Sequence, residues 1–65
     1  MQDFEIRLLN SGEVGISALT ERAQRARCLK PGHTLMFKSP ADAVAYVDVA
    51  EAEGFTFAGR ELLQR

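Results

Sequence analysis

Hydrophobic and polar residues alternate at the start of the chain. Residues 4–8 read Phe-Glu-Ile-Arg-Leu, and Val14 and Ile16 repeat the alternation after the turn-forming residues 10–12, Asn-Ser-Gly. A period of two residues is typical of a strand that buries one face. The pattern therefore predicts two strands joined as a hairpin.

The next segment changes to a helical spacing. Residues 18–29 are rich in helix-forming side chains, and Ser17 stands where an N-cap residue is preferred. At about 100° per residue, its apolar members fall on one arc. They are Leu19, Ala23, Ala26 and Leu29. Because proline cannot continue a helix, Pro31 and Gly32 mark its end.

A short apolar run and a second helix follow. Residues 34–38 are bounded by turn signals and predict a central strand. Ser39 and Pro40 have the chemistry of an N-cap and a first helical position, and Gly54 that of a C-terminal stop. The β-branched residues Val44, Val47 and Val49 allow a competing strand interpretation, but the cap and the alanine-rich end favour a helix.

The C-terminal segment completes the predicted fold. Residues 56–57 form a short strand or a bend, and residues 60–65 form a terminal helical turn. The element order is β-β-α-β-α, so we predict a single small α+β domain over residues 1–65. One antiparallel or mixed sheet is packed by two helices.

Composition narrows the classes of protein to consider. The chain has 65 residues, of which 46% are hydrophobic, with a net charge of −1, and this balance argues against disorder. One cysteine permits no internal disulfide, and one cysteine with one histidine cannot fill a tetrahedral zinc site in a monomer. No apolar run approaches the roughly 20 residues that span a bilayer. The acidic N-terminus does not resemble a signal peptide, so we expect no membrane contact and a cytoplasmic location.

Candidate catalytic residues are few. Cys28 lacks an activating histidine, because His33 follows a Pro-Gly turn with no acid beside it. Phosphate-binding loops, metal motifs and hydrolase motifs are not present in the sequence. We therefore expect no catalytic residue, no cofactor and no metal, and a protein that is not an enzyme.

Basic residues are concentrated in the middle of the chain. Residues 17–38 carry five bases and one acid. Four of the bases define a candidate nucleic-acid surface: Arg22, Arg25, Arg27 and Lys30. On a helical wheel they surround the apolar arc instead of forming a stripe, and bases near a helix C-terminus also favour the helix dipole. For Arg22 two interpretations stay open: its stem covers the core edge, or its guanidinium pairs with an acid of the second helix or of another chain.

The second helix has more apolar surface than one sheet can cover. Its first arc consists of Ala43, Val44, Tyr46, Val47 and Ala50. Its second arc consists of Ala41, Ala45, Val49 and Ala52. A two-layer domain uses one arc against its sheet, so the other contacts a different part of the chain or a partner.

The tail carries a family resemblance. Residues 50–63 read Ala-Glu-Ala-Glu-Gly-Phe-Thr-Phe-Ala-Gly-Arg-Glu-Leu-Leu. Residues 43–63 resemble the end of the Nif11 family of small bacterial domains, in which a helix closes in a Gly-Phe step before a short helix containing Glu-Leu. The resemblance implies a small bacterial protein or a leader of modified peptides. The first part of that family is helical, whereas residues 4–8 here predict a strand. A leader function is not carried over, because no processing site or downstream core peptide is evident in the sequence.

These features favour a small, non-enzymatic, regulatory module that binds another protein or a second copy of itself by steric occupation, such as a bacterial or phage inhibitor or adaptor. The predicted partner-binding residues are Ala45, Tyr46, Val49 and Ala52, with Arg22 and Arg25 as polar rim contacts. The alternative is a nucleic-acid or nucleoprotein binder that uses the basic segment from Arg22 to Lys30.

Overall fold

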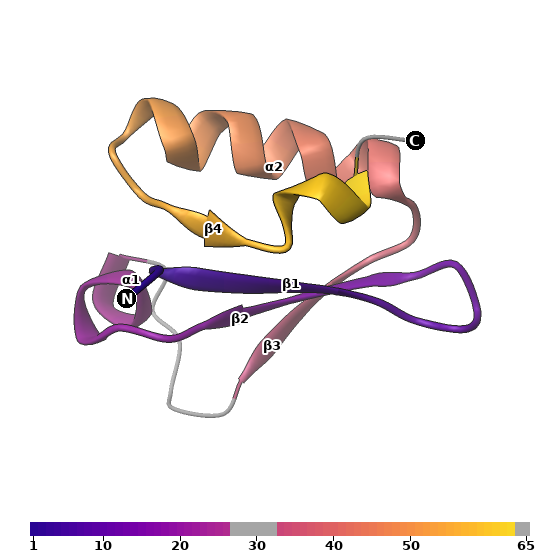
Figure 1. Cartoon of the computed structure of the whole chain (residues 1–65), viewed down its shortest axis with the longest axis horizontal. Helices are drawn as coiled ribbons and strands as arrows, with labels where there is room; N and C mark the ends of the chain where they lie inside the picture. The colour runs from indigo at the N-terminus through magenta and orange to yellow at the C-terminus, as the bar shows by residue number, and fades with distance from the viewer. Residues whose placement is uncertain (27–32, 64–65) are drawn as a thin grey trace.

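A computed structural model describes residues 1–26 and 33–63 of the chain. Within them the protein has the predicted α+β fold, with one mixed sheet of four strands (Figure 1). The strands are β1 (Phe4–Leu8), β2 (Val14–Ala18), β3 (Thr34–Phe37) and β4 (Phe57–Ala58). The helices are α1 (Glu21–Ala26), α2 (Pro40–Ala52) and the 3-10 helix η1 (Arg60–Leu63). The C-terminal strand and helical turn are therefore both present.

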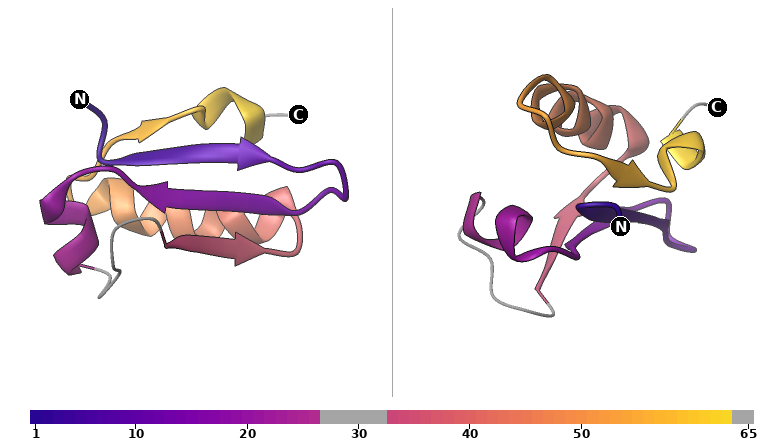
Figure 2. Two further views of the ribbon diagram at one scale, coloured as in Figure 1. Left: turned by 90° about the horizontal axis from the view of Figure 1, so that it is seen from below. Right: turned by 60° about the vertical axis from the view of Figure 1, so that its left-hand side comes forward.

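The strand order across the sheet is β3-β2-β1-β4. β1 is antiparallel to β2, β2 is antiparallel to β3, and β1 is parallel to β4, which returns to the sheet after α2 (Figure 2). The predicted hairpin is confirmed, with the Leu9 amide 2.9 Å from the Glu13 carbonyl oxygen beside the turn. The prediction of a central strand at residues 34–38 is wrong, because β3 lies at the sheet edge. Both inner positions are taken by the hairpin strands.

α2 begins and ends as the sequence predicts. The Ser39 hydroxyl oxygen accepts a hydrogen bond from the Asp42 amide at 3.4 Å, and Pro40 occupies the first turn. At the other end, Gly54 has a φ of +98°, a conformation that glycine adopts without a Cβ penalty. The Gly54 and Phe55 amides then donate to the Glu51 and Ala50 carbonyl oxygens. This pair of bonds is the Schellman motif, so both ends of α2 are fixed by local chemistry.

α1 begins later than the sequence predicts. Ser17 is not its N-cap but part of β2, where its hydroxyl lies 3.1 Å from that of Thr34 on the neighbouring strand. The cap is Thr20, whose hydroxyl oxygen accepts a hydrogen bond from the Ala23 amide at 3.2 Å. The predicted end of this helix at Leu29 lies outside the described residues. Ser17 and Thr20 have similar capping chemistry, and sheet pairing decides between them.

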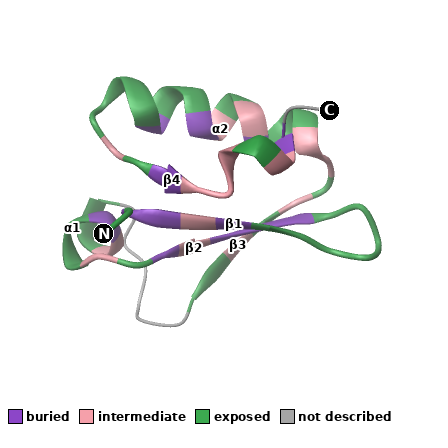
Figure 3. Cartoon of the chain, viewed as in Figure 1, coloured by how far each residue is buried: buried purple, intermediate pink, exposed green. Residues whose placement is uncertain are grey.

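The core lies between α2 and one face of the sheet (Figure 3). The largest fully buried side chains are Phe4, Val14, Ile16 and Val47. Phe4 lies at its centre and its ring stacks on that of Phe57 in β4 at a centroid distance of 4.8 Å. Leu8, predicted to share this buried face, is exposed near the hairpin turn. α1 lies at the end of the sheet where β1 begins (Figures 1 and 2).

Candidate functional site

α2 turns its two apolar arcs in opposite directions. From the first arc, Ala43, Val47 and Ala50 are buried against the sheet. The second arc is exposed along its whole length, and Val49 keeps 59% of its surface accessible. We call this second arc the outer face of α2; it consists of Ala41, Ala45, Val49 and Ala52. The structure thus brings Ala45, Val49 and Ala52 together on one surface.

Tyr46 lies apart from that surface. Its ring is half-buried and contacts Phe4 edge-on at a centroid distance of 6.4 Å and Phe37 at 5.3 Å. It therefore covers the margin of the core, on the side of α2 that faces the sheet. Any contribution of Tyr46 to a partner surface would come from this margin and not from the outer face.

Acidic side chains flank the outer face of α2. Asp48 is paired with Arg60 at 3.2 Å, and Glu51 is paired with the same guanidinium at 3.3 Å. Asp42 occupies the first turn, where a carboxylate favours the helix dipole. α2 carries no basic residue, and on this flank the single guanidinium of Arg60 in η1 is shared by two carboxylates, so the flank keeps a net negative charge.

The two described arginines of the basic segment, Arg22 and Arg25, both form ion pairs with acidic residues of this chain. Arg25 forms an ion pair with Glu21, one turn earlier on α1. Arg22 pairs with Asp3 at 2.8 Å, which is neither an acid of α2 nor an acid of another chain. Arg27, Lys30 and Cys28 lie outside the described residues, and His33 is exposed. The structure does not gather Arg22 and Arg25 on the outer face of α2, so their rim role stays a prediction.

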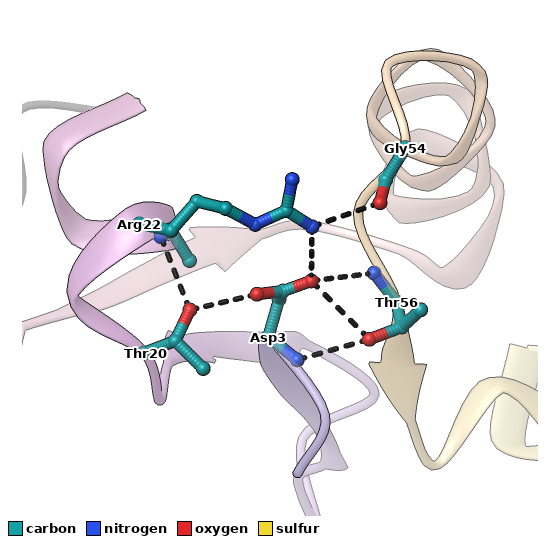
Figure 4. Close-up of polar contacts among 6 residues, drawn as sticks. Asp3, Thr20, Arg22, Gly54 and Thr56 are labelled. Atoms are coloured by element: carbon teal, nitrogen blue, oxygen red, sulfur yellow. Dashed lines mark hydrogen bonds and ion pairs between the residues drawn. The ribbon is translucent and has the colours of Figure 1, made fainter.

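Asp3 organises a polar cluster that the sequence analysis missed (Figure 4). We call it the Asp3 cluster; it consists of Asp3, Thr20, Arg22 and Thr56. The Asp3 carboxylate accepts hydrogen bonds from the Thr20 hydroxyl at 2.7 Å, the Arg22 Nη2 at 2.8 Å and the Thr56 amide at 3.1 Å. Asp3 is 6% exposed. The cluster therefore joins the start of β1 to α1 and to the segment after α2.

The cluster fixes the charge state of Asp3. The hydrogen bond from Arg22, followed by that from Thr20, holds the pKa of this carboxyl well below its ordinary value of 3.8. Burial acts in the opposite direction but is outweighed. Asp3 is therefore a carboxylate throughout the physiological range, and its bonds stabilise the fold wherever the unfolded chain would also be ionised.

Replacing Asp3 with asparagine is expected to lower the melting temperature by several degrees at neutral pH. The amide keeps the shape but loses the ion pair with Arg22. Because the folded pKa is depressed, the stability due to ionisation is present above about pH 4 and is lost as the pH falls below it. Urea unfolding across that range should show the difference between wild type and Asp3→Asn shrinking toward acid. A difference that stays constant, or an equal loss in the exposed control Glu61→Gln, would contradict this role.

No protein-family model, curated protein or solved structure matches this chain. The resemblance of residues 43–63 to the Nif11 family stays a prediction.

The described residues add three further observations. No helix among them is both long and apolar enough to cross a membrane. Their histidine, aspartate and glutamate side chains do not gather in a group of three that could hold a metal ion. Their surface has no pocket.

Proposed function

We propose that this protein is a small binding module that occupies a surface of another protein with the outer face of α2. The observation that carries the proposal is the exposure of Val49 between three alanines on a helix whose other apolar arc already fills the core. Covering Val49 would contribute about 1–2 kcal/mol of binding free energy. The small neighbours allow a partner to approach the helix backbone closely.

α2 presents this face as a rigid platform. Ser39 caps its start, Gly54 closes its end, and Val47 anchors its middle in the core. A surface held in this way needs little rearrangement on binding, so little binding free energy is lost to ordering. The module would act sterically, by covering a partner's surface.

Charge favours a different protein over a second copy of this chain. Asp42 lies on one flank of the outer face, and Asp48 and Glu51, which share the Arg60 guanidinium, lie on the other. Both flanks are therefore net negative, so two copies packed face to face would bring like charges together. A partner with an apolar centre and a basic rim would meet opposite charges.

Val49→Glu is expected to weaken association at least about tenfold while changing the folding free energy by no more than about 0.5 kcal/mol. The expectation follows because the side chain already faces solvent in the free protein. A photo-crosslinking residue at position 49 would identify the partner in the native host. Titration of that partner with the wild type and with Val49→Glu would then measure the loss of affinity. Light scattering would detect any self-association.

Met36→Glu is the matched control. Met36 is 51% exposed on β3, so it undergoes the same chemical change on another surface. We expect Met36→Glu to bind the partner with the same affinity as the wild type. If Val49→Glu retained full affinity, or if it failed to fold, the outer face of α2 would not be the binding surface.

A further inference from the structure

The Arg22 guanidinium lies in a site formed by three groups from other parts of the chain. Its Nη2 donates to the Asp3 carboxylate at 2.8 Å and to the Gly54 carbonyl oxygen at 2.9 Å. Its central carbon lies 4.5 Å from the centroid of the Phe55 ring. We call these three partners, Asp3, Gly54 and Phe55, the Arg22 receptor.

Most contacts that build the Arg22 receptor lie outside α1; the exception is the Thr20 hydroxyl at the start of α1, which donates to the Asp3 carboxylate at 2.7 Å. The Asp3 amide donates to the Thr56 carbonyl oxygen at 3.1 Å, and the Thr56 amide donates to the Asp3 carboxylate at the same distance. Gly54 is held by the Schellman motif at the end of α2. The Phe55 ring packs edge-on against Phe4 at a centroid distance of 5.6 Å. The sheet and α2 therefore hold the three groups in place.

Arg22 and α1, which carries it, have fewer buried contacts than the three groups of the Arg22 receptor. The described part of α1 has six residues, of which Ala23 alone is buried. The Arg22 side chain itself is 56% exposed. With one buried residue among those six, the position of this part of α1 depends on few contacts with the core.

We propose that Asp3, Gly54 and Phe55 form a guanidinium-binding site that Arg22 occupies in cis. The ligand class is an arginine side chain of another protein, which takes the place of Arg22 when α1 moves away. A carboxylate and a carbonyl oxygen accept hydrogen bonds from one edge of a guanidinium, while the aromatic face stacks on its plane. A compact ammonium lacks that plane and fits the site less well. Arg22 is then a built-in competitor that keeps the site closed.

Chemical rescue of Arg22→Ala tests this site. Methylguanidinium chloride at about 50 mM is expected to raise the melting temperature of Arg22→Ala by about 1–2 °C relative to its effect on the wild type, in which the site is filled. Methylammonium chloride at the same concentration controls for salt and for the cation. Amide NMR shifts of residues 54–56 should follow methylguanidinium in the variant and stay unchanged in the wild type.

Two further variants keep the result decisive. Arg22→Ala combined with Asp3→Asn should lose the rescue, because the carboxylate that accepts the guanidinium is gone. Arg22→Gln retains a polar side chain and serves the same NMR titration if Arg22→Ala does not fold. The proposal is overturned if methylguanidinium affects variant and wild type equally, if methylammonium rescues as well, or if rescue survives the loss of the Asp3 carboxylate.

Discussion

Replacing Phe4 with alanine is expected to cost about 3–5 kcal/mol of folding free energy, which is the range for a buried aromatic side chain. Phe4 is fully buried and its ring contacts Tyr46 in α2, Phe55 after it and Phe57 in β4. The substitution would therefore leave a cavity where three elements meet. A domain of this size has roughly 3–10 kcal/mol of stability in total, so the variant should be largely unfolded or close to it.

Circular dichroism and urea unfolding measure this effect. Phe4→Leu should recover part of the loss, because leucine refills much of the cavity without replacing the ring contacts. Met36→Ala removes a comparable apolar side chain from an exposed position and should change stability little. A Phe4→Ala protein as stable as Met36→Ala would show that the core is not centred on this ring.

Gly59→Ala is expected to destabilise the protein by about 3 kcal/mol or more, because backbone strain and a steric clash act together. Gly59 has a φ of +86°, and a Cβ there would lie 2.7 Å from the Ile6 carbonyl oxygen. Ile6 is in the middle of β1, where it pairs with Ile16 of β2. Its carbonyl group cannot retreat without disturbing the sheet.

Gly54→Ala separates the two causes. Gly54 has a similar φ of +98°, but nothing lies within 4 Å of the position of an added Cβ. This variant should lose only the conformational cost, about 1–2 kcal/mol. Comparing the two unfolding midpoints therefore isolates the contribution of the clash. Equal losses at the two glycines would show that η1 or β1 moves to accommodate the methyl group.

Local signals in the sequence were sufficient to predict α2. Ser39, Pro40 and Gly54 act on neighbours within a few residues, so the chemistry visible in the sequence is the chemistry that fixes the helix ends. The helical periodicity of residues 41–52 predicted two apolar arcs on α2 but left open whether the chain covers the second one, which the structure shows to be exposed. Alternation likewise located β1 and β2.

Features that depend on long-range pairing were not predictable in this way. Ser17 looks like a helix cap, but pairing of β2 with β3 keeps it in a strand. The apolar run of β3 looks central, but strand order is set by the hairpin and by the return of β4. Asp3 gave no local signal, because Thr20 is 17 residues away and Thr56 is 53 residues away. In the sequence, the cluster is visible only as an acidic residue just before a strand and a threonine just before a helix.

The parallel pairing of β1 with β4 has a consequence for the order of folding. The hairpin of β1 and β2 closes a short loop, because its strands are neighbours in the chain. Phe4 does not reach its stacking partner, Phe57, until β4 has joined the sheet. Closing so long a loop is slow and entropically costly, and aromatic surface stays exposed meanwhile. The stage at which the hairpin has formed and β4 has not yet docked is therefore the one at which aggregation competes most strongly with folding.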